Sequence, residues 1–264
     1  MPLGTIVMTG AAGQVGSSLR EALREDTGRL VLIDRVPMTA ERPNEEAHQI
    51  EVAGPDDLIP VVAGADAIVH LAGVPDEAPL ADLLTGNVLG TQHVLEAARR
   101  TGVRRVVLAS SNRLTGCYPT AETVSADMPP RPDGLYGVSK VAVEALGRLY
   151  VDKFGLEVVC LRIGSFEVEP SEARHLATWL SPRDCAGFVR AALTVETDFL
   201  AAYAVSANTQ RFWELSDELG YLPQDDAETQ PVEVTGTFTI GDEPQGGDFA
   251  TQAYTLEHGR LPAV

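Results

Sequence analysis

The chain alternates short apolar runs with longer stretches in which apolar residues recur every three or four positions. The short runs are typical of strands buried on both faces, and the longer stretches of amphipathic helices. We expect strands near residues 3–9, 29–34, 47–52, 66–71, 104–110, 157–163 and 199–205, and helices near 13–26, 55–63, 78–101, 135–154, 182–195 and 210–219. This alternation predicts an α/β fold, a Rossmann-type doubly wound parallel sheet with helices on both faces.

Two long connections and the C-terminal region stand outside this alternation. The proline-rich segment 111–133 and the segment 164–181 are expected to cross the mouth of a site. Residues from about 206 to 264 form a small C-terminal extension on the substrate side, polar and Pro/Gly-rich from Leu222 on, with one strand candidate at 234–240. We expect this tail to pack across the body or to form a subunit contact, and residues 1–264 to form a single domain.

A glycine-rich turn joins the first predicted strand to the first predicted helix. The turn reads Gly10-Ala11-Ala12-Gly13-Gln14-Val15-Gly16 and follows the apolar run from Leu3 to Thr9. Glycines allow a tight turn and close approach of a pyrophosphate, and the helix N-terminus offers free N–H groups. A glycine turn without a ligand is the alternative. The context favours dinucleotide binding by Gly10, Gly13, Gln14, Val15 and Gly16.

Asp34 ends the second predicted strand, eighteen residues beyond Gly16. A carboxylate near this position accepts hydrogen bonds from the adenosine ribose and repels a 2′-phosphate. NAD is therefore predicted over NADP, although the adjacent Arg35 could soften that preference.

Tyr136 and Lys140 share one face of the predicted helix 135–154, because they stand four residues apart. A nearby cation stabilises a phenolate and lowers the phenol pKa, so the pair could take a proton from an alcohol. Alone, they could equally be two surface residues. Ser110-Ser111-Asn112 ends the strand-like run before them, where polar side chains either face the ligand crevice or simply form a turn.

Taken in this order, the glycine turn, the Ser-Ser-Asn segment and the Tyr/Lys pair resemble the extended, sugar-active branch of the short-chain dehydrogenase/reductase superfamily over about residues 3–205. His70-Leu71-Ala72-Gly73 and Asn87-Val88-Leu89-Gly90-Thr91 also match that branch. Over nearly the whole chain, longer stretches resemble NAD-dependent uronate dehydrogenases. These stretches are Ser110–Asn112, Arg131–Lys140, Asp152–Gly155, Arg162–Ser165 and Arg174–Trp179.

The resemblance implies an oxidoreductase that oxidises the anomeric C1 of a hexuronic acid, glucuronate or galacturonate, to an aldaric acid lactone with hydride transfer to NAD. It implies a catalytic set of Tyr136, Lys140, Ser111 and Asn112. To the cofactor-binding residues of the glycine turn and Asp34, the resemblance adds Arg35, Glu51, Val52, Leu71, Ala72, Gly73, Tyr136, Lys140 and Ile163. The substrate set is Ser111, Asn112, Arg113, Tyr136, Ser165 and Arg174.

Arg174 matches the family's carboxylate-binding arginine, and a guanidinium binds a carboxylate through a planar two-pronged fork. The alternative is a loop arginine paired with Glu172 or Glu169. His70 and His175 are expected to be structural. Four residues depart from the family pattern and could shift sugar preference: Pro75 and Phe166, Arg113 in place of a histidine, and Glu51 in place of an aspartate.

The composition narrows the possible partners. A net charge of −18 argues against nucleic acid and anionic membranes. No apolar run is long enough to span a bilayer, and the N-terminus lacks a signal-peptide pattern. Three cysteines without metal-like spacing fit reduced thiols in the cytoplasm, and no metal site is predicted. We expect a cytoplasmic homo-oligomer that acts on a small acid sugar.

Two other functions fit the same scaffold. One is a sugar epimerase, dehydratase or other carbonyl reductase, and the other is a non-enzymatic regulator that binds NAD. The intact Ser111, Tyr136 and Lys140 set argues against the regulator. The short C-terminal extension argues against a nucleotide-sugar substrate.

Overall fold

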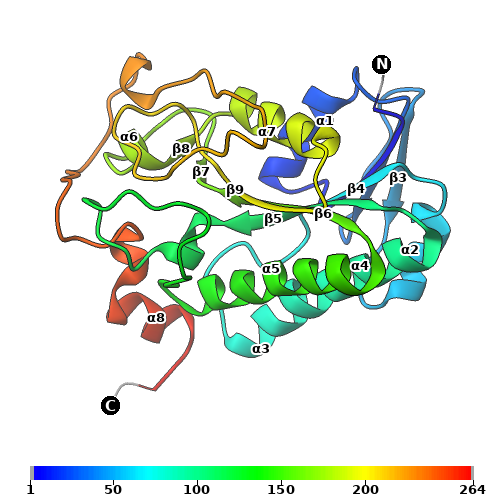
Figure 1. The fold of residues 1–264 in the computed structure, drawn as a ribbon, viewed down its shortest axis with the longest axis horizontal. Coiled ribbons are helices and arrows are strands. Elements are labelled where there is room, and N and C mark those ends of the chain that lie inside the picture. The colour runs from blue at the N-terminus through cyan, green and yellow to red at the C-terminus, as the bar shows by residue number, and fades with distance from the viewer. Residues whose placement is uncertain (1–2, 263–264) are drawn as a thin grey trace.

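Seven parallel strands form one sheet in the computed structural model, which describes residues 3–262 (Figure 1). Their order is β3-β2-β1-β4-β5-β6-β9. The strands are β1 (Thr5–Thr9), β2 (Arg29–Asp34), β3 (Glu45–Gln49), β4 (Ala67–His70), β5 (Arg105–Ser111), β6 (Glu157–Ile163) and β9 (Phe199–Ala204). The strand order changes direction between β1 and β4, which makes this the topological switch point of the sheet. Open α/β sheets bind ligands at such a point, beyond the carboxyl ends of the strands. The predicted Rossmann-type sheet is confirmed.

Helices cover both faces of the sheet, as predicted (Figure 1). One face carries α1 (Gln14–Leu23) and α7 (Pro182–Thr194), and the other carries α2 (Pro55–Val62), α4 (Gly90–Thr101) and α5 (Leu135–Phe154). Each face has its own apolar core. Leu19 and Phe188 belong to the first core, and Leu95 and Val143 to the second. Because both faces are buried, the inner strands read as continuous apolar runs.

The helix predicted at 78–101 forms as three consecutive pieces. These are α3 (Leu80–Leu83), a π-helical turn (Leu84–Leu89) and α4. The π turn carries Asn87, whose side chain accepts from the Val74 N–H at 2.7 Å and donates to Ser139 Oγ at 2.9 Å. A π turn inside a helix often marks a functional position, and here it ties the segment after β4 to α5.

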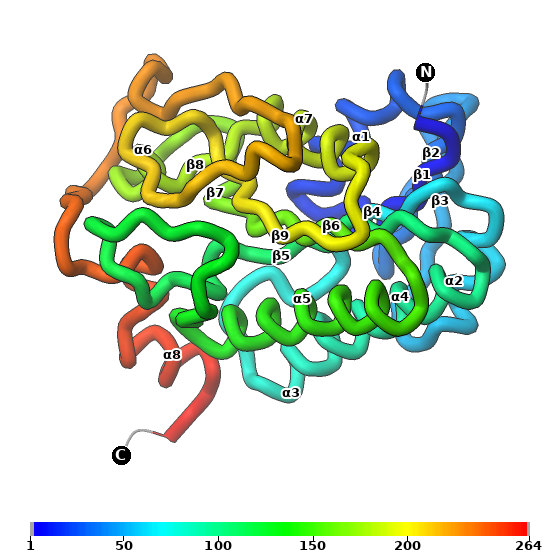
Figure 2. The backbone as a smooth tube through the Cα atoms, viewed as in Figure 1, coloured from blue at the N-terminus to red at the C-terminus, as the bar shows by residue number. Residues whose placement is uncertain are grey.

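The segments outside the alternation gather beyond the carboxyl ends of the strands, at the left of the view in Figure 2. Residues 111–133 begin with a 3-10 turn (Asn112–Thr115). Residues 164–181 hold β7 (Ser165–Phe166), α6 (His175–Thr178) and β8 (Trp179–Leu180). The C-terminal extension holds the 3-10 turns Ala227–Thr229 and Gly247–Ala250 and ends in α8 (Gln252–His258).

Two expectations for the C-terminal extension are wrong. No helix forms at 210–219, because the backbone of Phe212 and Glu214 bonds that of Val124 while Phe212 and Trp213 enter an aromatic cluster with Tyr203. The apolar spacing there reflects long-range packing, not helical periodicity. No strand forms at 234–240, where Thr235 makes an isolated bridge to Glu172. The third strand also begins and ends earlier than its predicted range of 47–52. Helix α8 lies in a region where no helix was predicted.

Candidate active site

Helix α5 brings Tyr136 against the end of β5. Gly137, the next residue, lies so close to the following turn that a Cβ there would stand 2.6 Å from the Arg113 carbonyl oxygen. This close approach places the buried Tyr136 phenol within hydrogen-bonding reach of the Ser111 hydroxyl. Asn112 begins the same turn and accepts from Ser111 Oγ through its side-chain oxygen at 3.3 Å. Three of the predicted catalytic residues are therefore neighbours.

Lys140 lies one helical turn beyond Tyr136. Its Nζ donates to the Ala109 carbonyl oxygen at 2.8 Å and stands 5.5 Å from the centroid of the Tyr136 ring. Burial lowers the pKa of Lys140 to about 8. This value leaves the ammonium mostly protonated at neutral pH, so the fourth predicted catalytic residue retains its charge beside the phenol.

Burial is the dominant influence on Tyr136 and raises its pKa to about 12. The hydrogen bond from Ser111 and the positive charge of Arg113 act in the opposite direction. The expectation that the lysine lowers this pKa is not met by the chain's own groups, because loss of water disfavours the phenolate more strongly. Further positive charge beside the phenol would lower this pKa.

The glycine turn lies beside the segment that follows β4. Gly10 has a φ of 71°, and a Cβ there would stand 2.6 Å from the Ala72 backbone nitrogen. Gly13 precedes α1 without a side-chain cap, so the first N–H groups of α1 have no such partner. Asp34 accepts from the N–H groups of Ala12, at 2.9 Å, and Val36, at 3.2 Å.

These features fit a dinucleotide. Free helix N–H groups favour a pyrophosphate, and a carboxylate fixed beside the turn favours a ribose with free hydroxyls. Gln14, Val15 and Gly16 lie on α1 next to this turn. The other predicted cofactor residues follow or end parallel strands: exposed Arg35 and Glu51 with partly buried Val52 after β2 and β3, Leu71, Ala72 and Gly73 after β4, and Ile163 at the end of β6.

Arg174 is a partly buried guanidinium with neutral hydrogen-bond acceptors. Its Nε donates to the Gln245 carbonyl oxygen at 3.1 Å and its Nη1 to Ser165 Oγ at 3.3 Å. Within residues 3–262, no carboxylate oxygen lies within 4.0 Å of it, so neither Glu172 nor Glu169 is its partner. Burial lowers the pKa of Arg174 to about 10. The structure thus brings Arg174 and Ser165 together, as the two substrate predictions require.

Arg113 has the opposite environment. Its guanidinium is buried and donates to Asp133 at 2.8 Å, to Asp76 at 2.6 Å and to Glu77 at 3.3 Å. That Arg113 binds substrate stays a prediction, and three carboxylates already pair with its guanidinium. Arg113 also stacks 5.3 Å from the centroid of the Tyr136 ring and acts on the phenol pKa.

The remaining predictions concern residues of structural character. His70 is buried, and its Nδ1 lies 2.7 Å from Thr9 Oγ1. Burial lowers the pKa of His70 to about 3, so the ring is neutral. His175 accepts from the Ser171 N–H at 3.1 Å within its own loop. Phe166 joins the core on the α1 and α7 face, and Pro75 stands in the segment that leads from β4 to α3.

Four residues around the site escaped prediction. Glu77, Asp133, Gln245 and Phe249 come from loops whose sequence carries no periodic signal. The ring of Phe249 lies between the two arginines, with its centroid 4.3 Å from Cζ of Arg113 and 5.6 Å from Cζ of Arg174. The C-terminal extension therefore supplies part of the site.

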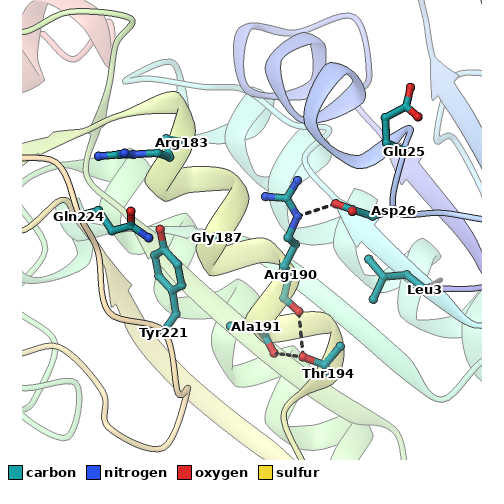
Figure 3. Close-up of a pocket in the computed structure, with 10 residues that line it drawn as sticks. All are labelled: Leu3, Glu25, Asp26, Arg183, Gly187, Arg190, Ala191, Thr194, Tyr221 and Gln224. Carbon is teal, nitrogen blue, oxygen red and sulfur yellow. Dashed lines mark hydrogen bonds and ion pairs between the residues drawn. The ribbon is translucent and has the colours of Figure 1, made fainter. Parts of the chain in front are cut away.

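A surface cavity of about 740 Å³ lies elsewhere, between the end of α1 and α7 (Figure 3). Arg190 projects toward Asp26 across it, and Tyr221 stands beside Gly187 on the same wall. None of the predicted site residues lines this cavity.

The family model described as the NAD dependent epimerase/dehydratase family matches residues 6–182. The chain belongs to this family. It is 41% identical to uronate dehydrogenase from Agrobacterium fabrum, over 92% of this chain and 96% of that protein. It is 38% identical to uronate dehydrogenase from Pseudomonas syringae pv. tomato, over 94% of each.

Solved structures agree. A mutant uronate dehydrogenase from Agrobacterium tumefaciens complexed with NAD matches with a TM-score of 0.85 and 39% identity, over 94% of this chain and 97% of that one. The predicted family and NAD as cofactor are confirmed, and the chain is an NAD-dependent oxidoreductase. No described helix of this family member is long and apolar enough to cross a membrane.

This family member should prefer NAD to NADP by at least about tenfold in kcat/KM, because the fixed Asp34 carboxylate repels a 2′-phosphate. Asp34→Asn should lower the ratio of kcat/KM with NAD to kcat/KM with NADP, because it removes the repelling charge. Arg35→Ala should raise that ratio, because it removes a cation that could attract the phosphate. Steady-state kinetics with both cofactors measure this directly. Equal wild-type values would show that Arg35 overrides Asp34.

Tyr136→Phe should keep NAD binding while kcat falls by at least about a hundredfold, because a positioned acid–base group contributes about 10²- to 10⁴-fold. Tyr150→Phe is a matched control, a buried tyrosine on the same helix about four turns away. Fluorescence titration gives the binding and NADH absorbance gives kcat. If Tyr136→Phe stays within a few-fold of wild type, another group accepts the proton.

Proposed function

We propose that this protein oxidises C1 of a hexuronic acid to the aldaric acid lactone, with NAD as hydride acceptor. One observation carries the proposal, the partly buried Arg174 that has no carboxylate partner among the described residues. In a chain with a net charge of −18, a partly buried arginine that forms no direct ion pair among the described residues is suited to an anionic ligand. A uronate supplies that anion on a sugar ring, as the C6 carboxylate attached to C5.

The roles of the site residues follow from their positions. Arg174 binds the substrate carboxylate, and Ser165, hydrogen-bonded to Arg174, binds a sugar hydroxyl. Ser111 and Asn112 hold the C1 hydroxyl against Tyr136. In this arrangement separate residues bind the carboxylate and the reacting C1 hydroxyl. Orientation of the reacting groups accounts for much of such a rate enhancement.

Oxidation at C1 breaks one C–H bond and one O–H bond. The glycine turn and Asp34 would hold NAD, which would supply the hydride acceptor and, in its oxidised form, a positive charge. Tyr136 Oη takes the hydroxyl proton. Lys140 Nζ and Arg113 Cζ lie 5.5 Å and 5.3 Å from the centroid of the Tyr136 ring, and Ser111 hydrogen-bonds to the phenol. Together with the cofactor's charge, these groups oppose the effect of burial on the Tyr136 pKa.

The experiment that tests the proposal follows NADH absorbance at 340 nm with a panel of substrates. Glucuronate and galacturonate should be oxidised, and the matching neutral hexoses and UDP-sugars should be poor substrates. A preference for UDP-sugars would favour the epimerase or dehydratase alternative. Oxidation of glucose or galactose as fast as the uronates would remove the acid-sugar assignment.

Arg174→Ala should lower kcat/KM for the uronate by about 30- to 5,000-fold, since removing one partner of a desolvated charge pair costs roughly 2–5 kcal/mol. Arg174→Lys should recover part of this loss, because an ammonium lacks the planar fork. Activity on the neutral hexose should barely change. Arg190→Ala, which removes an arginine already paired with Asp26, is the control. An equal fall for uronate and hexose would mean that Arg174 only supports its loop.

The homo-oligomer and the cytoplasmic location belong to the same proposal. Leu80, Leu84, Val138 and Leu149 are each exposed by at least 42% on the α3 and α5 side of the molecule, which supports a subunit contact there. Cys117, Cys160 and Cys185 are free thiols, which supports a reducing compartment. Light scattering after gel filtration should give a mass of at least twice 28.1 kDa, and a mass near 28 kDa would remove the oligomer.

A further inference from the structure

The N-terminus of the helix that carries Tyr136 is capped by a residue far away in the sequence. Gly134 precedes α5 and offers no side-chain cap. The carboxylate of Glu77 fills that role, with Oε1 accepting from the Leu135 N–H at 2.7 Å and Oε2 from the Tyr136 N–H at 3.1 Å. One of the two bonds is therefore made to the backbone of the predicted proton acceptor itself.

The Glu77 carboxylate is buried, and each of its oxygens accepts a hydrogen bond. Its side chain is fully buried, and Oε2 also accepts from Arg113 Nη2 at 3.3 Å. A Cβ on Gly134 would collide with the Glu77 carboxylate, so glycine at 134 leaves the space that the carboxylate occupies. A buried carboxylate is stable only when it is paired and hydrogen-bonded. The helix N-terminus, with its positive dipole end, and Arg113 meet both needs.

Glu77 also links the two halves of the site. It stands in the segment between β4 and α3, whose start, Leu71–Gly73, borders the predicted cofactor crevice. The same Arg113 that it binds belongs to the turn after Ser111 and Asn112. A single carboxylate thus fixes Tyr136 relative to the cofactor segment on one side and to the hydroxyl-binding residues on the other.

We propose that Glu77 is a positioning residue for the oxidation, because its carboxylate caps α5 and sets where the Tyr136 phenol stands. Glu77 touches neither substrate nor cofactor in this role. The inference rests on the proposed function insofar as Tyr136 accepts the proton. Its local contribution, the capping of α5, is measurable without any turnover.

The test compares Glu77→Gln with Glu45→Gln. Glu45 is a matched control, because it is also fully buried, ion-paired with an arginine, Arg20, and bonded to a backbone N–H, that of Glu41, but lies away from α5. The amide that replaces one Glu77 oxygen cannot accept from an N–H group. Kinetics, NADH-binding stoichiometry and hydrogen exchange of the peptide covering the start of α5 are measured for each variant.

Glu77→Gln should lower kcat by about 10- to 100-fold, since a displacement on the order of 1 Å at a reacting group costs about a hundredfold. NADH-binding stoichiometry should stay at the wild-type value, and hydrogen exchange should quicken at Leu135 and Tyr136. Glu45→Gln should leave all three readouts near wild type. A kcat within twofold of wild type would overturn the proposal, as would a fall in kcat that merely follows a fall in binding stoichiometry.

A second variant serves if Glu77→Gln does not fold. Gly134→Ala keeps every charge, and the extended φ of −171° at this position suits alanine, but its Cβ displaces the Glu77 carboxylate. It should reproduce the loss in kcat and the faster exchange, and wild-type values in both would again overturn the proposal. Failure of the proposed function looks different, because the wild-type enzyme would then not oxidise uronates while the exchange result at α5 would still hold.

Discussion

An arginine held by neutral acceptors is the constraint on which the site depends. Burying a guanidinium is costly unless hydrogen bonds and an opposite charge compensate it. Arg174 donates hydrogen bonds to the Gln245 carbonyl oxygen and to Ser165 Oγ, while the opposite charge is left for the ligand. Gln245 is itself fixed, because its side chain bonds Trp213, Pro119 and Glu122. The C-terminal extension therefore keeps Arg174 in place.

The two arginines of the site show how an acidic chain divides its charges. Arg113 is surrounded by Asp76, Glu77 and Asp133 and becomes part of the framework. Burial raises the pKa of Asp133 to about 6 in spite of Arg113. The ring of Phe249 lies close to both guanidinium groups. One arginine is thus neutralised to support Tyr136, and the other remains able to bind an anion.

The sequence predicts those features that local chemistry determines. Strand runs, the glycine turn, Asp34 and the Tyr136/Lys140 pair depend on spacing within one element or on two adjacent elements. Features that depend on distant contacts were missed or wrong. The segment 210–219 has a helical apolar pattern, but Val124 holds its backbone extended. Nothing local in the sequence reveals that Asp76, Glu77 and Asp133 converge on Arg113. The raised pKa of Tyr136 likewise follows from burial, which spacing does not report.

The most direct measurement of the central claim is calorimetric titration of the NADH complex with glucuronate and with glucose, which separates recognition of the carboxylate from turnover. Glucuronate should bind at least about thirtyfold more tightly, which corresponds to roughly 2 kcal/mol. Added salt should reduce this difference in affinity only modestly, because a partly buried ion pair is screened less than an exposed one. Equal affinities for the two sugars would contradict the claim that Arg174 is reserved for a carboxylate.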